Sequence, residues 1–274
     1  LIPTSLSFLK DCLSIKRKFH KKSFDLVITT FLVLSGWDRT ICNLVKSKRR
    51  FTIIHDPIPH SSMPISEAKK YKKLVAQSKE IVVLTKKFIP VIETEYSYPK
   101  EKIHYMRLGR MTFTDYSNQN EDNSIRSIRF LFFGRIDGYK GINILLNAYE
   151  LVSRDLGNSV ELCIAGNGDF SIYQDKYSTL TNASLINRYI DDDEIPKIFS
   201  KPGTVLVLPY IDATQSGVTP LAFQFSVPVI ASDTGGLKEQ LFDGKVGSYF
   251  KVGDCEQLYK EMKKYADNHE LYKQ

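Results

Sequence analysis

Short apolar runs rich in β-branched residues alternate with amphipathic stretches along most of the chain. In the first half, the runs at 25–29, 51–54 and 81–84 predict buried strands, and the stretches 36–46 and 66–77 have helical spacing. The second half predicts strands at 128–133, 160–165, 184–186, 205–208 and 229–231, and helices at 142–154, 192–199, 217–225, 235–242 and 254–267. Apolar strands that alternate with amphipathic helices are typical of parallel sheets covered on both faces. The pattern therefore predicts an α/β fold.

A polar stretch at 112–127 separates the two halves, and its composition is that of a linker. We therefore expect one domain at 1–115, a linker at 116–127 and a second domain at 128–274. Open parallel sheets bind ligands at the carboxyl ends of their strands. Two such domains are expected to face each other across a cleft.

The composition excludes some classes of protein. Of the 274 residues, 42% are hydrophobic and 12% aromatic, which is enough to build cores and excludes a disordered chain. The longest apolar stretch, 24–37, is interrupted by polar residues and is too short to span a bilayer. The four cysteines lie far apart without metal-binding spacing, as is typical of a reducing cytoplasm. We expect a cytoplasmic protein.

The net charge of +7 is distributed unevenly. Residues 1–125 contain 22 Lys and Arg against 12 Asp and Glu, which leaves 16 against 19 in the rest of the chain. Such a basic half is compatible with an anionic membrane surface, a phosphorylated acceptor or a solvated lysine-rich surface. Its clusters lack interleaved aromatic residues and any nucleic-acid-binding motif, so nucleic acid is not expected as a partner.

A first candidate site lies in the glycine-rich turn at 134–141, between a predicted strand and a predicted helix. Arg135 and Lys140 flank this turn beside the helix N-terminus, where backbone amides favour an anion. Two cations at such a position are suited to a diphosphate. A plain strand-turn-helix with surface cations is the other interpretation.

A second glycine pair, Gly166 and Gly168, follows the next predicted strand. The third glycine of a dinucleotide fingerprint is missing, because Ile172 stands near its place. The pair serves either the approach of a ligand to the backbone or the turn itself.

A third candidate site follows the strand at 205–208. Its residues Gln215, Ser216, Gly217, Val218 and Thr219 lead into a helix, whose first-turn amides would offer a second contact to an anion. All three candidate sites lie at the carboxyl ends of predicted parallel strands, and together they are more specific than any one of them.

At this point the sequence resembles the retaining GT-B glycosyltransferases of the family-4 type, the glycosyl transferases group 1. The resemblance is clear over 130–264 and weaker over 51–110. Its markers, in order, are Gly134-Arg135 with Lys140-Gly141, Ile164 to Gly168, Asn187 to Ile190 with Asp193-Glu194-Ile195, Pro228 to Ala231, and Gly235 to Glu239. The resemblance implies two Rossmann-like domains, with the donor-binding domain in the C-terminal half.

The resemblance also implies roles for single residues. Arg135 and Lys140 would bind the donor diphosphate, and the turn from Ser216 to Thr219 would cap the distal phosphate. The segment that begins with Asn187 and Arg188 would line the base pocket. His55 follows a predicted strand and matches the family's active-site histidine segment, so it would lie near the transferred sugar and stabilise charge in the transition state.

The sequence departs from the family pattern in two places. The positions of two glutamates eight residues apart hold Ala213 and Leu221, with Asp212 and Gln215 as neighbouring substitutes on the sugar side. The family's opening strand and glycine-rich loop have no counterpart before Asp25, so we expect the N-terminal domain to be incomplete.

The implied reaction is transfer of a sugar, with retention, from a UDP- or GDP-linked donor to the hydroxyl of a glycan or lipid-linked acceptor in cell-surface polysaccharide or glycolipid synthesis. No Asp-x-Asp pair lies at a strand end, so we expect neither a metal site nor a cofactor beyond the nucleotide-sugar. Peripheral membrane contact through the basic half is a further expectation. An inactive homologue that only binds nucleotide-sugar, a nucleotide-dependent oxidoreductase and a nucleic-acid-binding protein are the alternatives.

Overall fold

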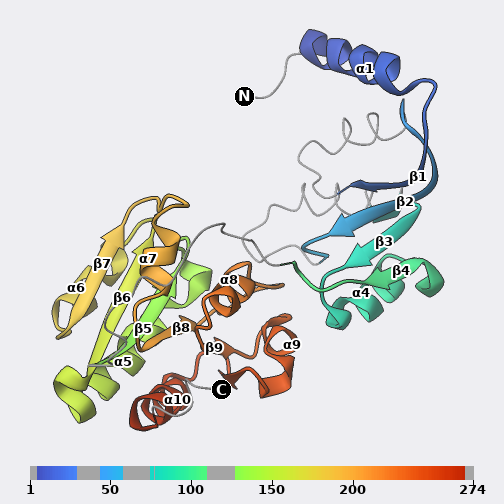
Figure 1. Cartoon of the computed structure of the whole chain (residues 1–274). Helices are drawn as coiled ribbons and strands as arrows, with labels where there is room; N and C mark the ends of the chain where they lie inside the picture. The colour runs from blue at the N-terminus through green and yellow to red at the C-terminus, as the bar shows by residue number, and fades with distance from the viewer. Residues whose placement is uncertain (1–4, 30–43, 58–74, 77, 110–126, 269–274) are drawn as a thin grey trace. The chain divides into compact units, whose positions relative to one another are not determined.

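The computed structural model describes residues 5–29, 44–57, 75–76, 78–109 and 127–268 (Figure 1), and the chain divides into two compact units, Leu1–Arg107 and Leu108–Gln274. The expected linker at 116–127 lies outside the described residues, except for its last position. Each unit contains its own hydrophobic core, built on its own parallel sheet. The predicted α/β fold with two parallel-sheet units is confirmed.

The first unit contains a four-stranded parallel sheet in the order β1-β2-β3-β4. Its strands are β1 (Ser23–Thr29), β2 (Lys46–Ile54), β3 (Glu80–Val83) and β4 (Ile103–Tyr105). Its helices are α1 (Ser5–Phe19), η1 (Lys86–Phe88), α4 (Ile89–Glu95) and η2 (Lys100–Lys102). The core packs β2 and β3 against α4 through Ile54, Ile81, Val83 and Ile92. Because the order follows the sequence, the direction of winding does not reverse among these strands.

The first unit differs from the sequence prediction at β2. This strand begins at Lys46, which was predicted as the last residue of a helix at 36–46. The other residues of that predicted helix lie mostly outside the described residues, and so do nearly all residues of the helix predicted at 66–77. The early half of β2 is polar and half-exposed, and Arg49 donates to both carboxylate oxygens of Glu80 on β3, at 3.0 and 2.6 Å. A solvated strand of this kind has no apolar period, so the sequence did not predict it.

The second unit contains a six-stranded parallel sheet in the order β10-β9-β8-β5-β6-β7. Its strands are β5 (Ile128–Phe133), β6 (Val160–Gly166), β7 (Ala183–Asn187), β8 (Thr204–Leu208), β9 (Val229–Ser232) and β10 (Gly247–Phe250). Its helices are α5 (Ile142–Leu156), α6 (Gln174–Ser178), α7 (Ile195–Phe199), α8 (Val218–Gln224), α9 (Leu237–Gln240) and α10 (Cys255–Asp267), with 3₁₀ turns η3 (Gly138–Lys140), η4 (Gly157–Ser159), η5 (Ser171–Tyr173) and η6 (Phe242–Gly244). The strands predicted from 128 to 231 are all present, whereas β10 and α6 were not predicted.

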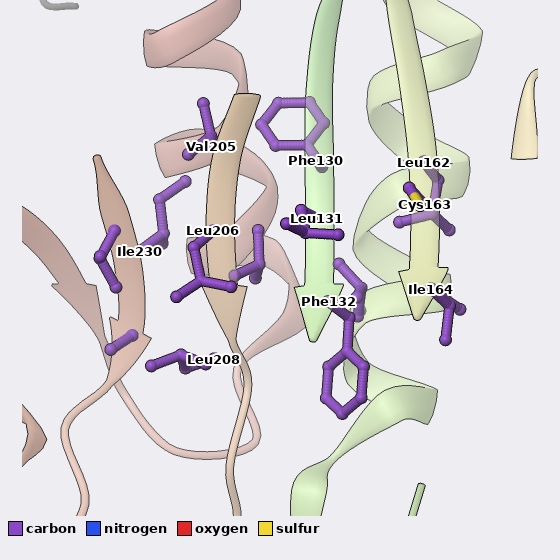
Figure 2. Packing of buried hydrophobic residues seen from close by; sticks show 14 of the residues in the cluster. Phe130, Leu131, Phe132, Leu162, Cys163, Ile164, Val205, Leu206, Leu208 and Ile230 are labelled. Carbon is purple, nitrogen blue, oxygen red and sulfur yellow. The ribbon is translucent and has the colours of Figure 1, made fainter. Parts of the chain in front are cut away.

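The core of this unit explains why its strands were readable from sequence. Figure 2 shows buried side chains from four neighbouring strands, and each strand contributes a continuous apolar run rather than an alternating one. The labelled residues are Ile230 of β9, Val205, Leu206 and Leu208 of β8, Phe130, Leu131 and Phe132 of β5, and Leu162, Cys163 and Ile164 of β6. Helices α5 and α10 contact each other and the sheet. Successive residues of a strand point to opposite faces, so the continuous buried runs of β5 and β8 show that both faces of the sheet are covered.

The strand order of the second unit locates its ligand-binding edge. The chain winds outward from β5 through β6 to β7, then returns to the other side of β5 and winds outward from β8 through β9 to β10. The winding therefore reverses between β5 and β8. In open α/β sheets, ligands bind outside the carboxyl ends of the strands at such a reversal. Among the helices of the described residues, none is both long and apolar enough to cross a membrane.

Candidate functional site

The loop after β5 brings its two cations onto aromatic rings. Arg135 Nη2 donates to Tyr139 Oη at 2.8 Å, and Arg135 Nε lies 3.5 Å from the carboxylate of Asp137. Lys140 Nζ lies 3.6 Å from the centroid of the Tyr210 ring and 5.0 Å from that of Tyr139. Since Tyr210 follows β8, Lys140 stands at the reversal between β5 and β8.

Lys140 is a cation in a poorly solvated place. Desolvation by burial, with a smaller contribution from the positive charge of Arg135, lowers the pKa of Lys140 to about 8. Burial also raises the pKa of Tyr210 to about 12, so its ring stays a neutral phenol. Within the described residues, Lys140 forms no ion pair with a carboxylate. An anion that arrives here would supply the opposite charge that Lys140 lacks.

Backbone contacts fix the loop after β5 to the loop after β8. Gly141 has a φ of +66°, and a Cβ at this position would lie 1.9 Å from the carbonyl oxygen of Pro209. The amide of Ile211 donates to the carbonyl of Tyr139 at 2.8 Å. These contacts hold the two loops in a fixed relation, and so they determine where Lys140 stands.

The glycine pair after β6 serves the packing of two loops. A Cβ on Gly166 would lie 1.8 Å from the carbonyl oxygen of Gly134, and one on Gly168 would lie 2.1 Å from that of Ile136. Gly134 donates to the carbonyl of Ala165 at 3.0 Å, so the two loops run side by side. Packing against the loop after β5 therefore explains both glycines. Their role as donor contacts stays a prediction. A dinucleotide fingerprint has no support here, because its glycines admit a pyrophosphate rather than a neighbouring loop.

The loop after β8 is anchored at Ser216. The side chain of Gln240, on α9, accepts from the Ser216 amide at 2.9 Å and donates to the Ser216 carbonyl at 3.0 Å. The Val218 amide donates to Ser216 Oγ at 3.3 Å, and that Oγ lies 3.4 Å from Tyr210 Oη. Two of the amides expected to contact an anion thus have protein partners already.

Two polar atoms, one in this loop and one in the first turn of α8, have no hydrogen-bond partner among the described residues. Gln215 Oε1 and Thr219 Oγ1 are both buried, and neither makes a hydrogen bond. Thr219 is 1% exposed, so its hydroxyl lacks water as well as protein. A buried polar atom without a partner costs about 1–3 kcal/mol. Each such atom calls for an explanation, and a bound water, an ion or a ligand can supply the missing partner.

The loop after β7 is held by its own ion pair. Arg188 donates to both carboxylate oxygens of Glu194 at 2.7 and 2.6 Å, and this pair lowers the pKa of Glu194 to about 2. The Asp191 amide donates to Glu194 as well, at 3.2 Å. Asn187 ends β7 and is exposed. These residues lie at the same sheet edge as Lys140, two strands away from β5.

In the first unit, His55 directly follows β2, as predicted, and is half-buried. It therefore stands at the carboxyl end of a parallel strand next to Ile54, a residue of that unit's core. His60 lies outside the described residues.

The two positions that depart from the family pattern are buried. Ala213 is 6% and Leu221 is 4% exposed, and both belong to the hydrophobic core. Leu221 lies in α8 and faces away from solvent. Within the described residues, no group of three or more His, Cys, Asp or Glu side chains is arranged to hold a metal ion.

Three residues of this site were not predicted from sequence. Tyr139 stands between the two cations in the chain and contacts both, so its position was a usable signal. Tyr210 follows a predicted strand, but only the fold places it against Lys140. Gln240 had no signal at all, because its contact with Ser216 depends on how two loops pack.

The family model of the glycosyl transferases group 1 matches residues 116–274 of this chain. The chain belongs to this family. The match covers the whole of the six-stranded sheet and every loop of the site in the second unit.

Individual proteins are similar to the chain at lower identity. An uncharacterized 41.2 kDa protein in the cps region of Klebsiella pneumoniae is 25% identical over 244 residues, which is 82% of this chain and 63% of that protein. The chain thus spans less than two thirds of that relative. A glycosyltransferase from Rickettsia africae has a TM-score of 0.70 at 15% identity, over 100% of this chain and 75% of its own. A TarM variant from S. aureus in complex with UDP has a TM-score of 0.65 at 17% identity, over 89% of this chain and 49% of its own. These structures share the GT-B fold.

Proposed function

We propose that the protein transfers a sugar from a nucleoside diphosphate sugar, UDP- or GDP-linked, to an acceptor hydroxyl. One observation carries this proposal. Lys140, a poorly solvated cation without a described carboxylate partner, stands at the reversal of the sheet, where the loop after β8 also contains the unpartnered Gln215 Oε1 and Thr219 Oγ1. A diphosphate supplies the negative charge that the lysine lacks, and the attached sugar brings hydroxyl groups to the segment that contains the two polar atoms.

In this proposal the two cations bind the diphosphate and stabilise it as it leaves. Arg135 is already oriented by Tyr139, so binding costs little side-chain entropy. The turn from Ser216 through Gly217 and Val218 to Thr219 contacts the distal phosphate and the sugar, while Asn187 and Arg188 border the base. Family membership and the UDP bound to a TarM variant of the same fold support the donor class.

We further propose that the transfer retains the anomeric configuration and needs no metal. The bond between the anomeric carbon and the phosphate oxygen breaks, and its electron pair goes to the diphosphate. That oxygen then takes the proton of the acceptor hydroxyl, which attacks the same face of the sugar. Arg135 and Lys140 supply the positive charge that a metal would otherwise provide. His55 stabilises the developing charge near the sugar.

The acceptor is proposed to be a glycan or lipid-linked glycan of the cell surface, since the cps-region relative points to polysaccharide synthesis. Helix α1 supports contact with an anionic membrane. Leu9 and Leu13 on this helix are 62% and 57% exposed, and Lys10, Arg17 and Lys18 lie around them. Flotation with vesicles of phosphatidylcholine, either alone or mixed with anionic phosphatidylglycerol, tests this contact. Equal binding to both vesicles would contradict it.

A binding panel tests the donor class. UDP, GDP, ADP, CMP and NADH are titrated against the wild type and against Arg135→Ala/Lys140→Ala, with heat of binding as the readout. We expect one nucleoside diphosphate to bind and the double variant to lose that binding. Binding of NADH alone would overturn the proposal in favour of an oxidoreductase. Product formation with a donor sugar of the base so identified then tests transfer.

An inactive homologue that only binds nucleotide-sugar is the second candidate. Ala213 and Leu221 favour it, because both are buried apolar residues where the family pattern has carboxylates. Donor binding without transfer, in a version that includes any missing N-terminal segment, would establish this alternative.

A further inference from the structure

Gln240 lies on α9, outside every segment that the proposed reaction uses, and yet its side chain reaches into the loop after β8. Its amide accepts from the backbone N–H of Ser216 and donates to the backbone C=O of the same residue, at 2.9 and 3.0 Å. A side-chain amide that satisfies both backbone groups of one residue imitates a strand pair and fixes that residue in two directions. Gln240 thus holds the backbone of Ser216.

Ser216 stands between the two unpartnered polar groups. Gln215 precedes it directly, and Thr219 lies three positions later, in the first turn of α8. Ser216 Oγ accepts from the amide of Val218, the first residue of α8, so the serine is also tied to the start of that helix. A displacement of the Ser216 backbone would therefore move both groups and the first turn of α8 together.

Other contacts hold the same loop nearer to β8, and Tyr210 Oη also lies 3.4 Å from Ser216 Oγ. Ser232 Oγ donates to the Tyr210 carbonyl at 2.5 Å, and the Gly236 amide donates to the Thr214 carbonyl at 2.8 Å. Gly235 fits closely under Ala213, where a Cβ would lie 1.6 Å from the carbonyl oxygen. Among the described contacts, Gln240 supplies the link from the loop after β9 to the part of the loop that contains the unpartnered groups.

We propose that Gln240 is a positioning residue for the nucleotide-sugar: it holds Ser216, and with it the segment 215–219, in place for the donor, without contact to the donor itself. This inference rests on the proposed function. It predicts that loss of the Gln240 amide weakens donor binding through Gln215 and Thr219.

The test uses the full chain, with UDP and GDP as probes. Gln240→Met keeps the length of the side chain and removes both hydrogen bonds. We expect the Kd of the nucleotide that the wild type binds to rise about tenfold, the change that a loss of one to two hydrogen bonds produces. Hydrogen exchange at the Ser216 amide should accelerate. Gln224→Met is the matched control, because Gln224 ends α8, is also half-buried and should leave the Kd unchanged.

A double-mutant cycle separates positioning from plain stability. In a Gln215→Ala/Thr219→Val background, Gln240→Met should weaken binding less than about twofold, since the groups it positions are gone. Fold-changes that multiply independently, or a Gln240→Met variant that binds as tightly as the wild type, would overturn the assignment alone. If the wild type bound neither UDP nor GDP, the proposed function would fail and this assignment with it, even if the exchange of Ser216 accelerated.

Discussion

Replacement of Lys140 by methionine should move stability and ligand binding in opposite directions. The pKa of Lys140 falls from 10.5 to about 8 in the folded state, a depression that corresponds to at most about 3 kcal/mol. At neutral pH the folded protein bears this cost because the lysine is still charged. Methionine removes the charge but also the contact with Tyr210, worth about 1 kcal/mol. We expect Lys140→Met to be about 1–2 kcal/mol more stable than the wild type at pH 7.

The pH dependence of this stability difference has a definite sign. The folded pKa lies below the unfolded one, so between about pH 8 and 10.5 the folded state has released its proton while the unfolded state retains it. The free energy of unfolding of the wild type therefore rises as pH increases across this window. This gain is lost again as pH falls through 8. The advantage of Lys140→Met should shrink across the same window, measured by urea unfolding at each pH.

Binding should respond in the reverse sense. Removal of one charged donor to a phosphate costs about 1.5–3 kcal/mol, so UDP or GDP should bind Lys140→Met about 10- to 100-fold more weakly at pH 7. At pH 9 the wild type has itself lost most of the Lys140 charge, so its affinity should fall about tenfold and approach that of the variant. The phosphate groups titrate near pH 6 and stay constant in this range.

Thermal and urea unfolding measure the change in stability, and calorimetric titration measures the change in affinity. Lys260→Met replaces an exposed lysine on α10 and is the matched control for the change of charge. The control should alter neither stability nor affinity by more than a small amount. The reasoning is refuted if Lys140→Met is less stable than the wild type, or if it binds the nucleotide equally well at pH 7.

Three further outcomes follow from contacts described above. Gly168→Ala should destabilise the protein by more than about 2 kcal/mol in a urea titration, because the new Cβ would lie 2.1 Å from a carbonyl oxygen and the φ is +157°. Gly138→Ala has open space around it and should be nearly neutral in the same titration. The Arg188–Glu194 pair lowers the pKa of Glu194 to about 2, so its contribution to stability is complete above about pH 4.5 and is lost as pH falls towards 2; Glu194→Gln should flatten the acid limb of stability against pH. His55→Ala should lower kcat far more than it raises the donor Kd, and equal loss in both would contradict a role near the transferred sugar.

The strands of the second unit could be predicted because a strand that is buried on both faces has apolar residues at successive positions. Phe130, Leu131 and Phe132 are successive and all fully buried, so the run leaves no other interpretation. The edge strand β10 (Gly247–Phe250) is half-exposed and short, and its pattern is too weak to identify. The polar start of β2 was missed because it has no apolar pattern, although Arg49 donates to Glu80 across the sheet there.

The candidate site was predictable as a set of loops but not as a set of contacts. Arg135 and Lys140 were recognised from their glycine-rich turn, yet the sequence contains nothing that places Tyr210 under Lys140. The glycines of β6 were visible, but that they face the carbonyls of Gly134 and Ile136 depends on two loops that fold against each other. Contacts between residues far apart in the chain follow from topology, which local patterns do not encode.

The self-contained loop after β7 has a consequence for how such enzymes diversify. Arg188 and Glu194 close this loop on itself, whereas the loops after β5, β6, β8 and β9 are fastened to one another. A substitution among the interlocked loops disturbs its neighbours and is rarely tolerated. Ile190 belongs to the core, but a substitution at one of the exposed positions 189 and 191–193 alters one surface alone. Under the proposed function, recognition of the base can therefore vary at this outer loop while the contacts proposed for the diphosphate stay unchanged, and laboratory selection for a different nucleotide should begin there.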